Sequence, residues 1–220
     1  MRRLQARGLH VVGLSRRASQ ANEHEPCDVA DRDSVNAAAA RVLERHPRIA
    51  LLVNNAGVGA RSNYLDANVE RIEETIQVNY LGSVWVTLAF LPGLAPGSHI
   101  VNVVSVAGTV ALPRSGPYAA SKHAQLAFSR ATAAQLRRRD IRVHTVKPGF
   151  VETEGFPQGW LPKAAQKLVI GPERVAEHVV SSVENRRGET TVPRYYALAA
   201  VLQALLPNLF SAALGRKIDS

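Results

Sequence analysis

The sequence predicts an α/β domain with a doubly wound parallel sheet that carries helices on both faces. Two features support this: short apolar runs that do not alternate with polar residues, and longer amphipathic or Ala-rich stretches between them. A continuous apolar run of strand length indicates a strand buried on both faces, and a helix between two such strands makes a parallel crossover. The 220 residues suffice for one domain with a large core.

The N-terminal part of the chain predicts the end of a helix, then two strands and a long helix. The opening helical turns stop at Gly8, and the apolar run at 9–14 predicts a buried strand. A polar loop leads to a second strand-like segment at 27–29. Asp31 is a typical N-cap residue, and the apolar positions after it predict one helix that ends near His46.

The middle of the chain alternates two further strands with two helices. The apolar run at 49–53 predicts a strand that ends in Asn-Asn-Ala-Gly, and a helical pattern follows from 68 to about 91. Proline-glycine pairs end that helix before the next strand, at 99–104. Residues 115–139 are Ala-rich and predict another helix.

The last predicted strand covers 141–146, and Pro172 stands at the first position of a further helix. Right-handed crossovers place the ligand crevice of such a sheet beyond the carboxyl ends of its strands. The polar or turn-forming residues at these strand ends are Arg16, Asp28, Asn54, Ser105 and Pro148-Gly149. The sequence contains no internal repeat, so we expect a single domain of this type.

Composition narrows the functional classes. The net charge of +9 raises a nucleic-acid role, but the basic residues are scattered with few aromatic residues among them, so we expect no nucleic-acid partner. Cys27 is the single cysteine, which excludes an internal disulfide and a Cys-based zinc site and suggests a reducing, cytoplasmic setting. Arginines interrupt the first residues, so no signal peptide is expected, and no metal site is predicted.

Tyr118 and Lys122 stand four residues apart in the stretch YAASK, so both project from one face of the helix predicted at 115–139. A free phenol has a pKa of about 10 and is a poor base at neutral pH. A nearby ammonium favours the phenolate and lowers that pKa, which makes a usable acid/base. Such a pair is also common on helix surfaces, so its weight depends on other motifs.

Six motifs in a fixed order support the interpretation of Tyr118 and Lys122 as an acid/base pair. They are SRR, CDV, NNAG, the helix QVNYLGS with Asn79, Ser105 thirteen residues before Tyr118, and PGFVET. With these motifs the chain resembles the short-chain dehydrogenase/reductase (SDR) family up to about Arg194. The resemblance implies a Rossmann-type domain in residues 1–194, followed by a C-terminal apolar helical segment in 195–220.

The resemblance implies a NADP-dependent oxidoreductase whose catalytic residues are Asn79, Ser105, Tyr118 and Lys122. Tyr118 would protonate the carbonyl oxygen of a ketone or aldehyde, or accept the alcohol proton in reverse. Lys122 would lower the Tyr118 pKa and bind the nicotinamide ribose, and Ser105 would hydrogen-bond the substrate oxygen. Asn79 would hold a water in the proton relay, and the nicotinamide cofactor would carry the hydride.

The resemblance also assigns the cofactor contacts. Asp28 in CDV would accept from the adenine amino group, although it could instead cap the helix at Asp31. Asn54 would line the adenosine side, with a plain turn as its alternative role. The full set of expected contacts is Arg16, Asp28, Val29, Asn54, Ala56, Gly57, Tyr118, Lys122, Pro148, Gly149, Val151 and Thr153.

The choice between NADP and NAD depends on the residues after the strand at 9–14. NAD-preferring relatives carry an acidic residue there that binds the ribose hydroxyls. Here the strand runs into Arg16-Arg17, and guanidinium groups suit a 2′-phosphate. We therefore expect NADP(H) to be preferred over NAD(H), with a solvated charge pair as the alternative interpretation.

One part of the family pattern has no counterpart in the sequence. The family begins with a strand and a glycine-rich turn that binds the pyrophosphate, and this chain contains no such turn. The missing strand would lie between those at 9–14 and 49–53, which leaves their edges unpaired. We expect an incomplete or mis-started record of an active enzyme, with a weakly active or inactive form that acts only through subunit association as the alternative.

The remaining expectations concern the substrate and the partners. Ser105, Phe150, Phe156 and Trp160 are the candidate substrate contacts and suggest an apolar carbonyl or alcohol substrate, although ordinary packing explains the aromatic residues equally well. The uncharged segment 195–215 favours packing on the domain or a partner subunit, with contact at a membrane surface through 195–216 as the alternative. The resemblance implies a homodimer or homotetramer.

Overall fold

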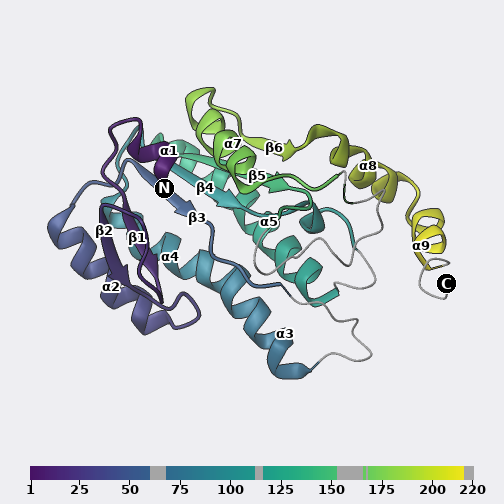
Figure 1. The fold of residues 1–220 in the computed structure, drawn as a ribbon, viewed down its shortest axis with the longest axis horizontal. Helices are drawn as coiled ribbons and strands as arrows, with labels where there is room; N and C mark the ends of the chain where they lie inside the picture. Colours follow the sequence, from purple (N-terminus) through teal and green to yellow (C-terminus); the bar gives the residue numbers. More distant parts are fainter. Residues whose placement is uncertain (60–67, 112–115, 153–165, 167, 216–220) are drawn as a thin grey trace.

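The computed structural model has the parallel α/β architecture expected from the sequence (Figure 1). It describes residues 1–59, 68–111, 116–152, 166 and 168–215. Its strands are all parallel and belong to two sheets, a two-stranded sheet near the N-terminus and a four-stranded sheet that runs through the rest of the molecule.

The N-terminal sheet pairs two short strands that lie beside one long helix. Helix α1 (Arg2–Gln5) leads into β1 (Val12–Ser15), which pairs with β2 (Glu23–Pro26) in the register Val12 to Glu23. Helix α2 (Arg32–Arg45) follows, with the Asp31 side chain accepting from the backbone N–H of Asp33 as its N-cap. This cap and the helix end near His46 confirm the sequence prediction.

Two predicted boundaries in this region are wrong. The strand predicted at 9–14 begins only at Val12. In place of the strand predicted at 27–29, the structure has β2, which ends immediately before those residues. The second error has a physical cause: β2 reads Glu-His-Glu-Pro, so its polar side chains hide it from a search for apolar runs. Arginines of α2 compensate the charge of these carboxylates. Arg41 and Arg45 form ion pairs with the buried Glu25 at 2.7 and 2.9 Å.

The main sheet has the order β3-β4-β5-β6. These strands are β3 (Leu51–Asn54), β4 (His99–Val103), β5 (Arg142–Pro148) and β6 (Glu189–Val192). The first three match predicted strands within a few residues. Strand β6 was not predicted, because this short edge strand is half polar and pairs only with the carboxyl half of β5.

Helices cover both faces of the main sheet, as the continuous apolar strands predicted. Neighbouring residues of β4 show this: Ile100 packs in a core with α2 and α4, whereas Val101 packs in a second core with α7. The helices are α3 (Val69–Ile76), a π-helical turn (Gln77–Leu81), α4 (Gly82–Phe90), α5 (Gly116–Leu136) and α7 (Pro172–Glu184). The alternation along β4 is the two-residue period of a strand buried on both faces.

The last helices lie beyond the carboxyl ends of the main sheet (Figure 1). They are α8 (Ala197–Leu205) and α9 (Pro207–Gly215), and their outward side chains include the exposed Leu198, Leu205 and Leu209. Among the described residues, no helix has both the length and the apolar character needed to cross a membrane.

The two sheets are not joined along their nearest edges. Within the described residues, β1 pairs only with β2, and β3 pairs only with β4. An apolar hollow of about 190 Å³ opens beside β3 and is lined in part by Leu4, Leu9, Leu51 and Val180. Within the part of the chain that the structure describes, the edge of β3 that faces away from β4 therefore pairs with no strand, and the hollow lies at the start of β3.

Candidate active site

Two hydroxyl groups meet at the carboxyl end of β4. Ser105 follows the strand and starts a short 3-10 turn, where its Oγ accepts a hydrogen bond from the backbone N–H of Ala107 at 3.1 Å. Tyr118 lies on the first turns of α5, and its hydroxyl interacts with the Ser105 side chain. The strand end and the helix start thus bring together residues that stand thirteen apart in the sequence.

Lys122 lies one turn further along α5, and its Nζ is 5.9 Å from the centre of the Tyr118 ring. The amine is buried and donates to the backbone carbonyl of Val103 at 3.2 Å and to Gln125 Oε1 at 2.7 Å. Neither partner carries a charge, so burial is not compensated by an ion pair. Burial accordingly lowers the pKa of Lys122 to about 7.

The electrostatics at Tyr118 differ from the sequence expectation. Burial raises the pKa of the Tyr118 phenol above its ordinary value, and the hydrogen bond with Ser105 is the interaction that opposes this rise. The expectation that the Lys122 ammonium lowers this pKa is therefore not met in this arrangement. The reason is that the same burial also disfavours the charged form of Lys122.

Asn79 is held rigidly behind this pair. It is fully buried in the π-helical turn 77–81, an irregularity often found at functional sites. Its Oδ1 accepts from the backbone N–H of Val58 at 2.8 Å, and its Nδ2 donates to the Val58 carbonyl at 3.0 Å and to Ser121 Oγ at 2.9 Å. Asn79 therefore ties α5 to the chain that follows β3.

A polar network connects Lys122 with Asn79, and sequence reasoning did not identify it. Gln125 accepts from Lys122 and donates through Nε2 to Ser83 Oγ at 2.8 Å, and Ser83 Oγ donates to the Asn79 carbonyl at 3.2 Å. Gln125 stands three residues after Lys122 on the same helix, so its spacing offered a signal. Ser83 offered none, since its role depends on how α4 packs against α5.

Gly57 leaves space in front of these polar groups. A Cβ atom built at this position would lie 3.2 Å from Asn79 Oδ1 and 3.7 Å from Lys122 Nζ. A larger side chain would therefore fill the approach to both groups. Ala56 and Gly57 are themselves exposed, so this part of the chain offers backbone atoms to a ligand at the sheet edge.

The Asn54 side chain makes its contacts inside the domain. At the end of β3 it is buried, and its Nδ2 donates to Asn102 Oδ1 at 2.8 Å and to Thr87 Oγ1 at 3.0 Å. Asn102 in turn donates to Ser129 Oγ at 2.8 Å. The Asn54 amide nitrogen thus joins β3 to β4 and α4, and Asn102 extends this link to α5. The sequence pattern could not distinguish this structural role from a cofactor contact.

The predicted adenosine side lies at the carboxyl ends of β1 and β2. Arg16 Nη1 lies 3.8 Å from Asp28 Oδ2, and the Arg16 side chain is 68% exposed. Asp28 also accepts from the backbone N–H of Ala30 at 2.9 Å, so part of its role is to shape this turn. Val29 packs against Gly82, where a Cβ atom would lie 2.9 Å from the Val29 carbonyl oxygen.

The end of β5 carries the other predicted ligand contacts. The Pro148 carbonyl accepts a long hydrogen bond of 3.5 Å from Ser105 Oγ, and Gly149 follows directly. The ring of Tyr196 covers Gly149, where a Cβ atom would lie 2.1 Å from it, and contacts Phe150 edge-on at 6.0 Å. Tyr196 was not among the predicted site residues, and only its place at the start of the apolar C-terminal segment offered a signal.

The C-terminal segment reaches the same region. Gln203 of α8 accepts through Oε1 from the backbone N–H of Ala111 at 2.9 Å, which places α8 beside the chain that follows Ser105. Val151 forms an isolated parallel bridge with Ile170. Of the remaining predicted contacts, Thr153, Phe156 and Trp160 lie outside the described residues.

Taken together, the described residues place a phenol, a serine hydroxyl, an amine and an amide within one connected set at the sheet edge. Ser121 completes the connection, since its Oγ donates to the Tyr118 carbonyl at 2.7 Å and accepts from Asn79. Such a set can hydrogen-bond one oxygen atom of a ligand and move a proton to or from it.

The chain is similar to proteins of one known family. The family model described as short chain dehydrogenase matches residues 1–159. Dehydrogenase/reductase SDR family member 7B of Xenopus laevis is 34% identical over 195 residues, which cover 83% of this chain and 60% of the relative. Estradiol 17-beta-dehydrogenase 11 of Mus musculus is 33% identical over 197 residues, which cover 87% of this chain and 65% of the relative. The chain thus spans less than two thirds of these relatives.

Two solved structures extend the comparison to the fold. A short chain dehydrogenase from Burkholderia cenocepacia in complex with NADP superposes with a TM-score of 0.83 at 27% identity, covering 97% of this chain and 90% of that one. A short chain dehydrogenase/reductase from Burkholderia phymatum in complex with NAD has a TM-score of 0.73 at 25% identity, covering 86% of this chain and 78% of that one.

Proposed function

Because the chain belongs to the short-chain dehydrogenase/reductase family, we propose that it interconverts a ketone or aldehyde and an alcohol, with Tyr118 as the acid/base. One observation carries the proposal: the Tyr118 hydroxyl interacts with Ser105 while the Lys122 amine lies beside the same ring. Two neighbouring hydroxyls can bind a carbonyl oxygen, and one of them can give it a proton.

Each residue of the set then has a distinct task. Ser105 hydrogen-bonds the substrate oxygen and steadies the Tyr118 hydroxyl, which transfers the proton. Lys122, with a pKa of about 7, can take up and release a proton at neutral pH. Asn79 fixes the position of α5 against the chain after β3. It also lies at the end of the hydrogen-bond network that begins at Lys122.

The residues present fit a nicotinamide nucleotide as the hydride carrier. Gly57 keeps the approach to Lys122 and Asn79 unfilled, Ala56 and Gly57 are exposed, and Arg16 lies beside Asp28 at the carboxyl end of β1. When bound, the nucleotide supplies or accepts the hydride. The proposed contacts are Arg16, Asp28, Val29, Ala56, Gly57, Tyr118, Lys122, Pro148, Gly149, Val151 and Thr153, with Asn54 supporting them from inside the domain.

We further propose that NADP(H) is preferred over NAD(H). The support is the exposed Arg16 guanidinium at the end of β1, where an acidic residue would favour NAD. Titration of the purified chain with NADPH and with NADH, followed by cofactor fluorescence, tests this directly. We expect tighter binding of NADPH and loss of that preference in Arg16→Ala, with exposed Arg174→Ala as the control; equal affinities for both nucleotides would contradict the proposal.

The substrate is proposed to be an apolar carbonyl compound or alcohol. Phe150 and Tyr196 lie against each other beside Gly149, and buried Val110 follows Ser105, so apolar groups surround the site on this side. One relative is named an estradiol dehydrogenase, which supports a substrate of this kind. A panel of apolar ketones and polar sugars assayed with NADPH would separate the two classes, and activity on sugars alone would contradict the assignment.

We also propose an oligomeric state, a role for the C-terminal segment and a cellular location. A homodimer or homotetramer, formed through the helices that carry Asn79 and Tyr118, follows the family expectation. We propose residues 1–194 as the catalytic domain and 195–220 as a C-terminal segment that contacts the domain and, through its exposed apolar residues, a partner subunit or membrane surface. The proposed location is the cytoplasm, with attachment at a membrane periphery.

The separation of the two sheets favours a second candidate function. In the described residues no strand joins β1 to β3, so the sheet edge that would carry the nucleotide is interrupted. A chain with this arrangement can keep its site residues, show weak or no catalysis, and act through subunit association. The NADPH titration distinguishes the candidates, because only the catalytic candidate requires binding of the nucleotide.

A further inference from the structure

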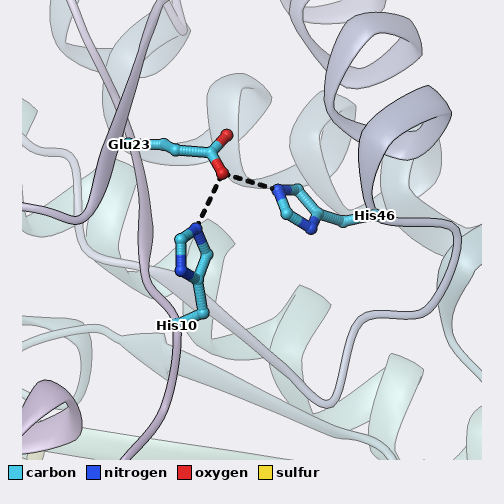
Figure 2. A group of neighbouring side chains, drawn as sticks. All are labelled: His10, Glu23 and His46. Carbon is cyan, nitrogen blue, oxygen red and sulfur yellow. Dashed lines mark hydrogen bonds and ion pairs between the residues drawn. The ribbon is translucent and has the colours of Figure 1, made fainter.

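Three potential metal ligands converge near the amino ends of β1 and β2. Arg16 and Asp28 lie at the opposite, carboxyl ends of these strands. Figure 2 shows His10, Glu23 and His46 facing one another. His10 precedes β1, Glu23 is the first residue of β2, and His46 is the C-cap of α2. Glu23 Oε1 lies 2.7 Å from His10 Nε2 and 2.9 Å from His46 Nε2.

We propose that His10, Glu23 and His46 form a binding site for a divalent transition metal, with Zn²⁺ as the best match. Two imidazole nitrogens and one carboxylate oxygen are a typical zinc ligand set, with water at the fourth position. The three ligand atoms all lie within 4.8 Å of one another in the structure. His10 is exposed, so a fourth ligand from solvent can reach the site.

Side-chain movements would bring the three ligand atoms, which lie within 4.8 Å of one another, to the spacing that the ion requires. Ligands of a tetrahedral Zn²⁺ lie about 2.0–2.2 Å from the metal and therefore roughly 3.4 Å from one another. The contacts of 2.7 and 2.9 Å to Glu23 would open by about half an ångström on binding. Surface side chains can make this change through their χ angles, while the backbone positions stay as they are.

The backbone around the ligands is fixed by hydrogen bonds, which favours a defined site. The Glu23 N–H donates to the Val11 carbonyl at 3.2 Å, next to His10, and the His46 N–H donates to the Val42 carbonyl at 2.7 Å. These bonds hold the three ligands at the same end of the β1–β2 pair. A site assembled from fixed elements loses less conformational freedom on binding.

Arg45 is the cation that competes most directly for Glu23. Its Nε lies 3.3 Å from Glu23 Oε2, while its Nη2 lies 2.9 Å from Glu25 Oε2. The guanidinium thus engages the oxygen that does not face the histidines and shares its charge with a second carboxylate. Glu23 Oε1 remains directed at both imidazoles, and Arg45 acts as an outer partner that orients the carboxylate.

The position of the site indicates a structural role for the ion. It would link the loop before β1, the start of β2 and the end of α2, whereas the residues proposed to bind the nucleotide lie at the opposite strand ends. Binding should therefore stabilise the N-terminal sheet against α2 without contacting Tyr118. This inference is independent of the proposed function, and it departs from the sequence expectation that the chain holds no metal.

Calorimetric titration of untagged, chelator-treated protein with Zn²⁺ at pH 7.5 tests the site. We expect one ion per chain with a micromolar or lower Kd, and a higher Tm in the presence of Zn²⁺. His10→Ala and His46→Ala should each weaken binding by more than the roughly 100-fold that loss of an outer partner can cost. His178→Ala, at a half-buried histidine of α7, is the matched control and should leave the Kd unchanged.

Co²⁺ provides a readout on the unmodified protein, which keeps the test valid where a variant does not fold. A visible absorption band of a four-coordinate nitrogen and oxygen site, removed by equimolar Zn²⁺, supports the proposal. The proposal is overturned if the unmodified protein takes up no stoichiometric Zn²⁺, or if both histidine variants bind it as tightly as His178→Ala.

Discussion

At Lys122 a primary amine is buried with only uncharged partners. Its Nζ donates to a backbone carbonyl and to Gln125, and its pKa is lowered to about 7 by burial. A lysine in water keeps its proton to a pH of about 10.4. The side chain therefore loses its proton in the folded state over a range in which the unfolded chain still holds one.

This difference predicts how stability depends on pH. Between about pH 7 and 10 the unfolded state binds the additional proton, so the free energy of unfolding should rise with pH by about 1 kcal/mol per unit from this group. Lys122→Met should remove that contribution. Urea denaturation of both proteins at pH 7, 8 and 9 measures it, and parallel pH profiles would contradict the burial of an uncompensated amine.

The proposed catalytic residues could be selected from the sequence, but their electrostatics could not. The order of Asn79, Ser105 and YAASK selected side chains that lie near one another in the structure, because the strand end and the helix start are fixed by the fold. The raised pKa of Tyr118 and the lowered pKa of Lys122 depend on how deeply both groups are covered. Burial of this kind arises from packing between elements distant in sequence.

At the scale of elements, the π-helical turn 77–81 sets the position of Asn79. The five-residue turn interrupts what sequence periodicity presented as one helix from 68 to 91, and it leaves Asn79 fully buried. Both hydrogen-bonding groups of the Val58 backbone are bound by this one side chain. The turn therefore couples α3 and α4 to the chain after β3.

Removal of the Asn79 amide should destabilise the domain. Asn79→Ala leaves the Val58 N–H and carbonyl without their partner, so we expect a loss of about 1–3 kcal/mol in the free energy of unfolding. Asn36→Ala, at an exposed position of α2, is the control and should change it by less than about 0.5 kcal/mol. Urea denaturation measures both, and equal stabilities would show that Asn79 does not hold this segment.

Helix ends were predictable at the element scale, whereas polar strands were not. Asp31 caps α2, Asn68 caps α3 and Pro172 opens α7, and each is a local signal that needs no tertiary partner. The strands β2 and β6 contain Glu residues, whose carboxylates pair with Arg45, Arg130 and Lys147. Only the folded neighbours make those sequences suitable for a sheet.

At the scale of the whole molecule, the C-terminal helices present an unusually apolar surface. Leu198, Leu205 and Leu209 on α8 and α9 are between 63% and 73% exposed, while Gln203 holds α8 to the domain. Clustered exposed leucines of this kind mark contact surfaces in many proteins. They support the proposal of a partner subunit or membrane surface at this end of the molecule.

The double variant Leu205→Glu/Leu209→Glu tests the role of this surface. Two carboxylates on the exposed face should abolish vesicle binding and association through this surface, because a charge buried in either contact is strongly disfavoured. A dimer formed through the helices that carry Asn79 and Tyr118 should persist. Light scattering after gel filtration and co-sedimentation with anionic vesicles measure the two outcomes. NADPH affinity should stay unchanged, and a variant that associates and sediments like the unmodified protein would contradict the assignment of this surface.

The central claim is that Tyr118 transfers the proton while Ser105 holds the substrate oxygen. The most direct test is single-turnover reduction of a carbonyl substrate by NADPH, with unmodified protein and Tyr118→Phe compared at saturating cofactor. We predict that the variant keeps its NADPH affinity and loses turnover by about 100-fold or more. Turnover close to that of the unmodified protein, at the same NADPH occupancy, would contradict the role assigned to Tyr118.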